Sequence, residues 1–243
     1  MRLALLTLVA LAAGRAAAGE PNDYVHMPIV EEGESEIEWK AGHQRLPQHD
    51  GSASAEAIGL GTSPVAGWFT EIYAKYAKTP GQGTAFDAVE WENLFQLTQT
   101  GRWPVDVGVL LEVEHPANHA EGIQVTAGPL LQYVSGRLQS NLNVLLQQNH
   151  GATEDLPSEL HVQGQLRWYG DGRCDVGAQL FGETRQWNHP GPLSHQTLTL
   201  GPALFGKLHL GQRQTLQWNA ALLGGVGAAS PPVTVRMQAE LEF

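Results

Sequence analysis

The sequence is poor in three features that would each point to a particular class of protein. It has a single cysteine, so no disulfide can form within the chain. Lys and Arg number 14 against 25 Asp and Glu, a formal net charge of −11, and phosphate binding needs a basic face, so we expect no nucleic-acid partner. After the N-terminus there is no apolar run long enough for a transmembrane helix, so a helical membrane protein is excluded.

The one sustained apolar run lies at the N-terminus, from Leu3 to Ala13, after the positive charge of Arg2. This run is too short to span a bilayer, and small residues follow it up to Ala18. A basic start, a short apolar core and a small-residue cleavage site are typical of a secretory signal peptide. We predict cleavage near Ala18, which removes residues 1–18.

Apolar and polar residues alternate strictly over the last residues of the chain. Such a period of two places the two sets on opposite faces of a β-strand. The length matches the roughly 9–11 residues that a tilted strand needs to cross the hydrocarbon. The apolar set is Val233, Val235, Met237, Ala239, Leu241 and Phe243, and the polar set is Thr234, Arg236, Gln238, Glu240 and Glu242.

The same alternation recurs along the chain and predicts about twelve strands. An even number lets a single chain close into an antiparallel barrel with both termini on one side, and closure leaves no open strand edge in lipid. The segment ending at Phe243 should then pair with the one that holds Ile37 and Trp39. Ten strands, with two segments merged, stay possible. The segments are roughly 35–42, 53–62, 67–78, 84–98, 103–114, 121–133, 136–149, 158–169, 173–186, 193–206, 213–226 and 231–243.

A soluble sandwich or lipocalin would also alternate, with its apolar set turned inward, so the two classes must be separated. The apolar faces carry no charge outside residues 53–61, where Glu56 shares parity with Ile58 and Leu60 and the register stays open. A lipid-facing Lys or Arg costs about 2–4 kcal/mol at the midplane, so this absence favours a membrane barrel. Aromatic residues fall mostly near predicted strand ends, as interfacial girdles do: Trp39, Trp68, Tyr76, Trp91, Tyr133, Trp168 and Trp218.

The connections between these segments are of two kinds that largely alternate. Tight turns are predicted at Gly101-Arg102, Ser135-Gly136 and Gly170-Asp171-Gly172. Longer polar connections cover residues 43–52, 115–120, 149–157 and 187–194. Short periplasmic turns and long extracellular loops are typical of outer-membrane barrels.

The polar face of the predicted strands is rich in carboxylates. A negative lumen would favour cations or neutral polar solutes; the alternative is a salt-bridged wall that selects no solute. Buried charges must be paired or wet, so we expect the bases to pair with neighbouring glutamates. The predicted lumen-facing charges are Glu38, Lys40, Glu71, Lys75, Glu90, Glu92, Asp106, Glu112, Arg167, Asp175, Arg236 and Glu240, together with Glu36, Glu114, Glu183 and Glu242.

Two other kinds of site are weaker. Seven histidines fall in predicted extracellular loops, but none has a spacing that sharpens a metal site, so we expect no metal and no cofactor. A lipid-modifying enzyme could use Ser140, on an apolar face, and His195, near an outer loop, but neither lies in a nucleophile motif, so we expect no enzyme. The loop histidines are His43, His49, His115, His119, His150, His189 and His195.

The final strand also carries a resemblance to a known class. Val235, Met237, Leu241 and Phe243, which end the chain on phenylalanine, resemble the terminal signal of bacterial outer-membrane proteins, which the barrel-assembly machinery reads. The segments Glu36-Ile37-Glu38-Trp39, Glu90-Trp91-Glu92-Asn93 and Gly128-Pro129-Leu130-Leu131 are loosely similar to the barrels called putative phenol-degradation (MetA-pathway) outer-membrane proteins. That resemblance implies transport of small organic molecules and assigns no site residue.

Together these observations predict an all-β protein: a closed antiparallel transmembrane barrel over residues 35–243. Residues 19–34 precede it, and the sequence leaves open whether they enter the lumen as a plug or lie in the periplasm. We expect a monomer in the outer membrane, with lipids and the assembly machinery as partners, that passes or binds a small solute. The runner-up is a plugged, non-conducting barrel whose loops form an interaction surface.

Overall fold

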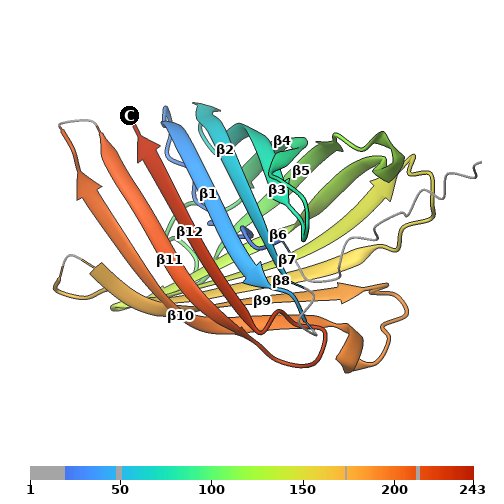
Figure 1. The fold of residues 1–243 in the computed structure, drawn as a ribbon. Helices are drawn as coiled ribbons and strands as arrows, with labels where there is room; N and C mark the ends of the chain where they lie inside the picture. Colours follow the sequence, from blue (N-terminus) through green and yellow to red (C-terminus); the bar gives the residue numbers. More distant parts are fainter. Residues whose placement is uncertain (1–19, 48–50, 173, 212–213) are drawn as a thin grey trace, which may run out of the picture.

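The computed structural model describes residues 20–47, 51–172, 174–211 and 214–243, so the predicted signal peptide lies outside the described part. Twelve antiparallel strands close into a single barrel (Figure 1), which confirms the predicted fold class and strand number. Two 3-10 turns, η2 (His119–Glu121) and η3 (Leu193–His195), lie in connections. The strands are β1 (Ser35–Arg45), β2 (Ser52–Val65), β3 (Trp68–Lys78), β4 (Ala85–Gln96), β5 (Asp106–Pro116), β6 (Ile123–Ser135), β7 (Leu138–His150), β8 (Glu159–Trp168), β9 (Cys174–Arg185), β10 (Thr197–His209), β11 (Thr215–Gly225) and β12 (Val233–Glu242).

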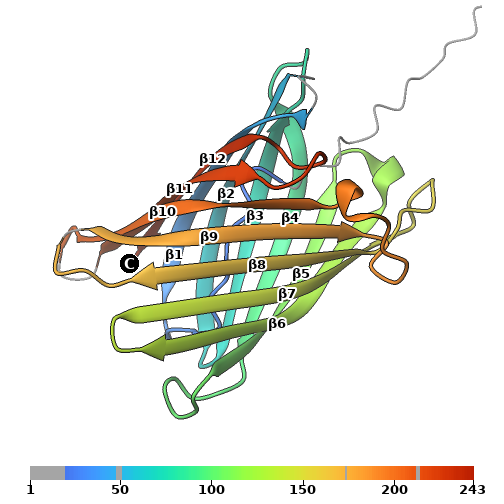
Figure 2. The ribbon, with the colours of Figure 1, turned by 90° about the horizontal axis from the view of Figure 1, so that it is seen from below.

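The barrel closes where the first strand meets the last. β1 pairs with β12, as the sequence predicted, and the structure adds the register, with Ile37 opposite Leu241 and Trp39 opposite Ala239. The amide of Phe243 donates to the carbonyl of Ser35 at 2.9 Å, so the pairing extends to the end of the chain. Figure 2 shows the remaining strands following one another around the barrel in chain order.

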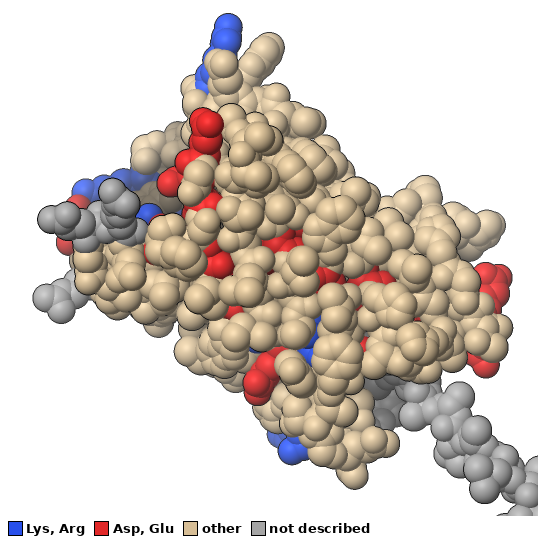
Figure 3. All heavy atoms as spheres, turned by 90° about the horizontal axis from the view of Figure 1, so that it is seen from above, with Lys and Arg blue, Asp and Glu red and all other residues tan. Residues whose placement is uncertain are grey.

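Side chains on each strand alternate between the outer surface and the lumen. On β12, Val235 and Met237 are 45% and 49% exposed, whereas Thr234 and Arg236, which alternate with them, are each 4% exposed. Uncharged atoms cover most of the face in Figure 3, and the carboxylates visible there lie recessed between them or at its ends. The period-two prediction that apolar residues face outward is therefore confirmed.

The register of β2, which the sequence left open, follows from its neighbours. Glu56 faces outward with Ile58 and Leu60, near the loop end of the strand. The small residues between them face inward because the rings of Tyr73 and Phe69 on β3 fill that part of the lumen. A Cβ added at Gly59 would overlap the Tyr73 ring, and one at Gly61 would overlap the Phe69 ring.

The two ends of the barrel have different connections. At the end where β1 begins and β12 ends lie the β2–β3, β4–β5, β6–β7, β8–β9 and β10–β11 connections, and the remaining connections lie at the other end. Short and long connections therefore alternate as predicted, except that Gly101-Arg102 belongs to a longer connection. There the Arg102 amide donates to the Gln99 carbonyl at 3.1 Å, and Gly101 adopts a positive φ of 69°. Among the described residues, no helix is long and apolar enough to cross a membrane.

The described chain starts near the end of the barrel where β1 ends, opposite the C-terminus. Glu20, the first described residue, lines a cavity with Gln44 and Pro231 near that end, so the expectation that both termini lie on one side is wrong for the described part of the chain.

The aromatic residues follow the girdle prediction only in part. Trp68, Tyr133 and Trp168 lie at strand ends, at the end of the barrel that holds the C-terminus, where interfacial residues belong. Trp39 and Trp91 lie farther along β1 and β4, so not every outward aromatic marks a strand end.

The lumen is less uniformly polar than the alternation implied. The inward face also carries two buried apolar clusters, which the sequence reading did not single out. Because these side chains are packed against one another, part of the interior resembles a protein core rather than a water-filled pore. The first cluster is Phe69, Leu94, Leu110, Leu130 and Leu145, and the second is Ala203, Phe205, Ala221 and Leu223.

The Gly59→Ala substitution tests the packing of the wall. The new methyl group must displace the Tyr73 ring, so we expect the free energy of unfolding to fall by about 1–3 kcal/mol, the usual cost of overpacking. Urea unfolding in detergent micelles measures this change. Gly164→Ala is the control, because the nearest atoms there lie 3.9 Å away; equal stability of both variants would contradict the packing.

Candidate functional site: the lumen and the segment inside it

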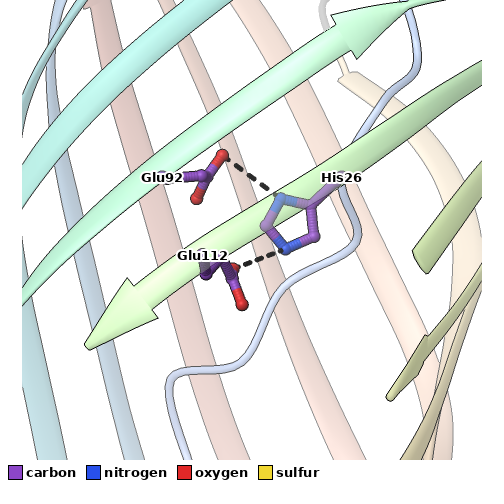
Figure 4. Close-up of side chains that lie close together, drawn as sticks. All are labelled: His26, Glu92 and Glu112. Carbon is purple, nitrogen blue, oxygen red and sulfur yellow. Dashed lines mark ion pairs between the residues drawn. The ribbon is translucent and has the colours of Figure 1, made fainter. Parts of the chain in front are cut away.

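Residues 20–34, which we call the N-terminal segment, enter the barrel. Val25 and His26 are 6% and 4% exposed, and Asn22 and Pro28 are also buried. Gly42 on β1 makes room for the segment, since a Cβ there would overlap the carbonyl of Pro21. In Figure 4 the segment is the pale blue coil that runs inside the barrel wall. Of the two positions that the sequence left open, the structure has the segment in the lumen.

His26 sits between two carboxylates of adjacent strands. Its Nδ1 lies 3.4 Å from a Glu92 oxygen on β4, and its Nε2 lies 3.6 Å from a Glu112 oxygen on β5 (Figure 4). The amide of Asn143 on β7 holds the backbone of the same residue: oriented to satisfy both groups, its oxygen accepts from the His26 amide at 2.7 Å and its nitrogen donates to the His26 carbonyl at 3.1 Å. His26 therefore links β4 and β5 to β7 through the lumen.

Tyr24 supports the same contact from one side. Its ring centroid lies 4.2 Å from that of His26, and its hydroxyl donates to Glu92. The ammonium of Lys40 lies 3.5 Å from the Tyr24 ring centroid and 3.6 Å from that of Tyr73, which are cation–π distances. The segment thus adds an aromatic face to the charged wall.

Further anchors lie toward both ends of the segment. Before Tyr24, the Glu20 carboxylate lies 2.9 Å from the Lys75 ammonium on β3. Beyond His26, the Val30 amide donates to Gln96 on β4 at 2.8 Å, and its side chain packs against the cluster that contains Phe69. The segment is fixed mainly by contacts that involve side chains, and only its last residues, Gly33 and Glu34, form backbone hydrogen bonds with β2, at Ser63.

The predicted lumen charges all face inward. Glu38, Lys40, Glu71, Lys75, Glu92, Asp106 and Arg236 are buried, and Glu90, Glu112, Arg167, Asp175 and Glu240 are half-buried. Most of the carboxylates lie on β1, β3, β4, β5 and β12, so one side of the lumen forms an acidic wall. Asp106 is an exception in its role, because its carboxylate accepts from the Gly101 amide and stabilises a turn.

Three of the four lumen bases form the ion pairs that the sequence predicted. Lys75 lies 2.9 Å from Glu90 and also contacts Glu114, and Lys40 lies 3.3 Å from Glu38. On the other side, Arg167 pairs with Asp175 at 2.7 Å, whereas the guanidinium of Arg236 lies 3.9 Å from the ring centroid of Phe181. The bases are therefore already engaged by the wall.

An amide wall faces the acidic one and was missed by the sequence reading. Gln139 and Asn141 on β7 donate to Gln132 on β6 at 3.1 and 3.0 Å. Gln179 on β9 donates to Gln165 on β8 at 2.7 Å. The signal was present in the alternating Asn and Gln of these strands, but no charge marked it. This wall offers neutral donors and acceptors to a solute.

A carboxylate cluster lies at the end of the barrel where β1 begins and β12 ends. Oxygen atoms of Glu34, Glu240 and Glu242 lie within 4.8 Å of one another. Burial, with the negative charges of Glu242 and Glu31, raises the pKa of Glu34 to about 7. Glu34 is thus partly protonated near neutral pH, which lowers the negative charge where β1 meets β12.

A cavity lies between the segment and the wall. It is bounded by Asp23, His161, Gln163, Glu183 and Arg236 and has a volume of about 30 Å³. This cavity has room for water but not for a larger solute.

The other candidate sites are not assembled. The rings of His115 and His119 are 5.2 Å apart, but no group of three potential metal ligands in the described residues includes them, and His49 lies outside that part. Ser140 is close to the 136–137 turn, at the end of the barrel that holds the C-terminus, whereas His195 lies in η3 at the opposite end. The structure therefore does not bring together the pair considered for a lipid-modifying enzyme.

Comparison with known proteins identifies the fold. The barrel is similar to the COG4313 outer membrane channel from Pseudomonas putida F1, with a TM-score of 0.60 and 9% identity over 93% of this chain and 100% of that one. It is also similar to the NanC porin (TM-score 0.57, 10% identity, 85% and 98% covered) and to a KdgM porin in complex with disordered oligogalacturonate (0.54, 8%, 86% and 98%). No family model and no curated protein matches the sequence, so the MetA-pathway resemblance stays a prediction. The chain has the fold of porin-like outer-membrane barrels.

The Gly42→Leu substitution tests the position of the N-terminal segment. A side chain at this lumen-facing position occupies the place of the Pro21 carbonyl, so we expect the segment to leave the lumen while the barrel stays folded. Chymotrypsin should then cut after Tyr24 much faster than in the unmodified protein. Gly164→Leu is the control; equal protection of Tyr24 in all three proteins would contradict the placement.

Proposed function

We propose that this protein is an outer-membrane channel for a small solute, held closed by its own N-terminal segment. The observation that carries the proposal is a closed barrel with a mainly apolar exterior and a charged lumen that the segment enters. The fold shared with outer-membrane porins and channels supports it.

The membrane location rests on the exterior of the barrel. Outward positions such as Ile72, Leu60 and Leu222 are more than half exposed, and a soluble protein rarely exposes so large an apolar surface. A closed sheet in lipid also satisfies every strand edge. The last strand presents Val235, Met237 and Phe243 outward, which fits the proposed recognition by the barrel-assembly machinery after cleavage near Ala18.

Solute passage requires movement of the N-terminal segment. The segment contains no strand or helix, and its contacts with the wall are a small set of ion pairs, hydrogen bonds and one apolar contact. Each strand, by contrast, is held by continuous pairing on both sides. Displacement of the segment therefore need not unfold the barrel.

The charge of the lumen favours cations or neutral polar solutes. Carboxylates outnumber bases on the inward faces of the strands, and Lys40, Lys75 and Arg167 are engaged in ion pairs with the wall. The KdgM porin is described with oligogalacturonate, which is an acidic sugar chain. We do not extend that ligand class to this protein, since an acidic wall repels anions.

The alternative function is a plugged barrel that does not conduct. The segment inside the lumen and its ion pairs are compatible with either function: a barrel that never conducts and a channel that is closed at rest. Conductance across a planar bilayer separates the two, because a closed channel should open at least briefly when the segment is weakened.

Cation selectivity is the expected result in a salt gradient. In asymmetric KCl, the reversal potential of the open protein should give a permeability ratio for K⁺ over Cl⁻ above one. Glu38→Gln combined with Glu71→Gln removes two buried carboxylates of the acidic wall and should lower that ratio. A preference for Cl⁻ in the unmodified protein would contradict an acidic conduction path.

Weakening the segment should raise the conductance. The combined substitutions Glu20→Ala, Tyr24→Ala and His26→Ala remove its contacts with Lys75, Glu92 and Glu112, and we expect a severalfold increase in mean current. The matched control is Glu31→Ala with Glu32→Ala, because both side chains are exposed on the same segment. Silence of every variant, with folding intact, would favour the non-conducting alternative.

A further inference from the structure

We infer that Glu92 and Glu112 form a binding site for a planar organic cation that carries N–H donors, such as a guanidinium, amidinium or imidazolium group. His26 fills this site in the closed barrel, so ligand and segment compete for it. The inference rests on the proposed function, because a solute reaches the site only after the segment moves.

The first argument is the donor geometry at His26. Each ring nitrogen faces a different carboxylate, at 3.4 and 3.6 Å, and ionised carboxylates only accept hydrogen bonds. A neutral imidazole has one donor and one acceptor, so it would leave one carboxylate facing a lone pair. The imidazolium ion, with two N–H groups, satisfies both. The site thus matches a flat cation with donors that point apart.

The second argument concerns what remains when the segment leaves. Glu92 then loses both His26 and the Tyr24 hydroxyl, and Glu112 loses its contact with His26. Lys40 and Lys75 stay nearby, but Lys40 pairs with Glu38 and Lys75 pairs with Glu90 and Glu114, so the carboxylates of this wall outnumber its bases. An excess of carboxylates in a confined lumen favours an incoming cation.

The surroundings of the site suit an organic cation. Tyr73, which is 1% exposed, presents its hydroxyl 3.4 Å from that of Tyr24 and stays in place when the segment leaves. When the segment leaves, Asn143 loses its two contacts with the His26 backbone and keeps its contact with Gln163, so part of its hydrogen-bonding capacity becomes available to a ligand. Charge, an aromatic side chain and an amide therefore surround the same point.

A metal ion fits the arrangement less well. The ligand atoms of His26, Glu92 and Glu112 lie within 4.8 Å of one another, which would allow a chelate by distance alone. A chelate, however, needs a single nitrogen lone pair directed at an ion that both carboxylates share. Here the ring lies between the carboxylates and each nitrogen is used by a different one, so His26 would have to turn.

Calorimetric titration of the folded, full mature chain in detergent micelles with methylguanidinium tests the inference. We expect His26→Ala to bind it at least about tenfold more tightly than the unmodified protein, because His26 competes at a high effective concentration. Adding Glu92→Gln and Glu112→Gln to His26→Ala should abolish binding. The matched control adds Glu36→Gln and Glu240→Gln to His26→Ala instead. These changes remove the same charge where β1 meets β12, and the variant should still bind methylguanidinium. Tetramethylammonium, a cation without N–H donors, should bind far more weakly.

Three results would overturn the inference: equal methylguanidinium binding after loss of Glu92 and Glu112, equal binding of tetramethylammonium, or binding of Zn²⁺ alone. Should His26→Ala not fold, the unmodified protein still gives an answer, because methylguanidinium should speed chymotrypsin cleavage after Tyr24. Binding in micelles needs no current, so binding by a silent barrel would refute only the proposed channel. Conduction without binding would refute only this site.

Discussion

The structure depends on one constraint: charged groups turned into a closed sheet must find partners there. Alternation along the strands sends the apolar residues to the outside and leaves carboxylates on the inner face. Removing one partner of a buried ion pair costs about 3–5 kcal/mol in proteins, so such groups are seldom left alone. Lys75 meets part of this demand for Glu90 and Glu114, and Glu92 and Glu112 meet theirs with His26 from the N-terminal segment.

The same constraint divides the lumen into regions with different roles. The acidic wall binds side chains of the segment, the amide wall is hydrogen-bonded within itself and through Asn143 to the segment backbone, and two apolar clusters fill part of the interior. A barrel of this size would otherwise hold a lumen wide enough for small solutes. The segment thus supplies the missing partners, and under the proposed function it would also supply the closure.

Much of the wall was predictable from the sequence, because strand alternation is a local pattern. The pairing of the first strand with the last followed from closure, and the inward charges followed from parity, whereas the register that sets Ile37 opposite Leu241 came from the structure. The outward position of Glu56 did not, since it depends on the bulk of Tyr73 on the next strand, which requires glycine or alanine inside β2. The N-terminal segment was beyond prediction because coil has no period, and its partners lie far along the chain, as with Val30 and Gln96.

The account is tested most directly by the accessibility of the segment in the folded barrel. In a Cys174→Ser background, Val25→Cys places a thiol at a position that is 6% exposed, and Ser52→Cys places one at an exposed strand end. With a water-soluble maleimide, we expect Val25→Cys to react far more slowly than Ser52→Cys in micelles and at a similar rate in denaturant. Equal rates in the folded protein would mean that the segment lies outside the lumen.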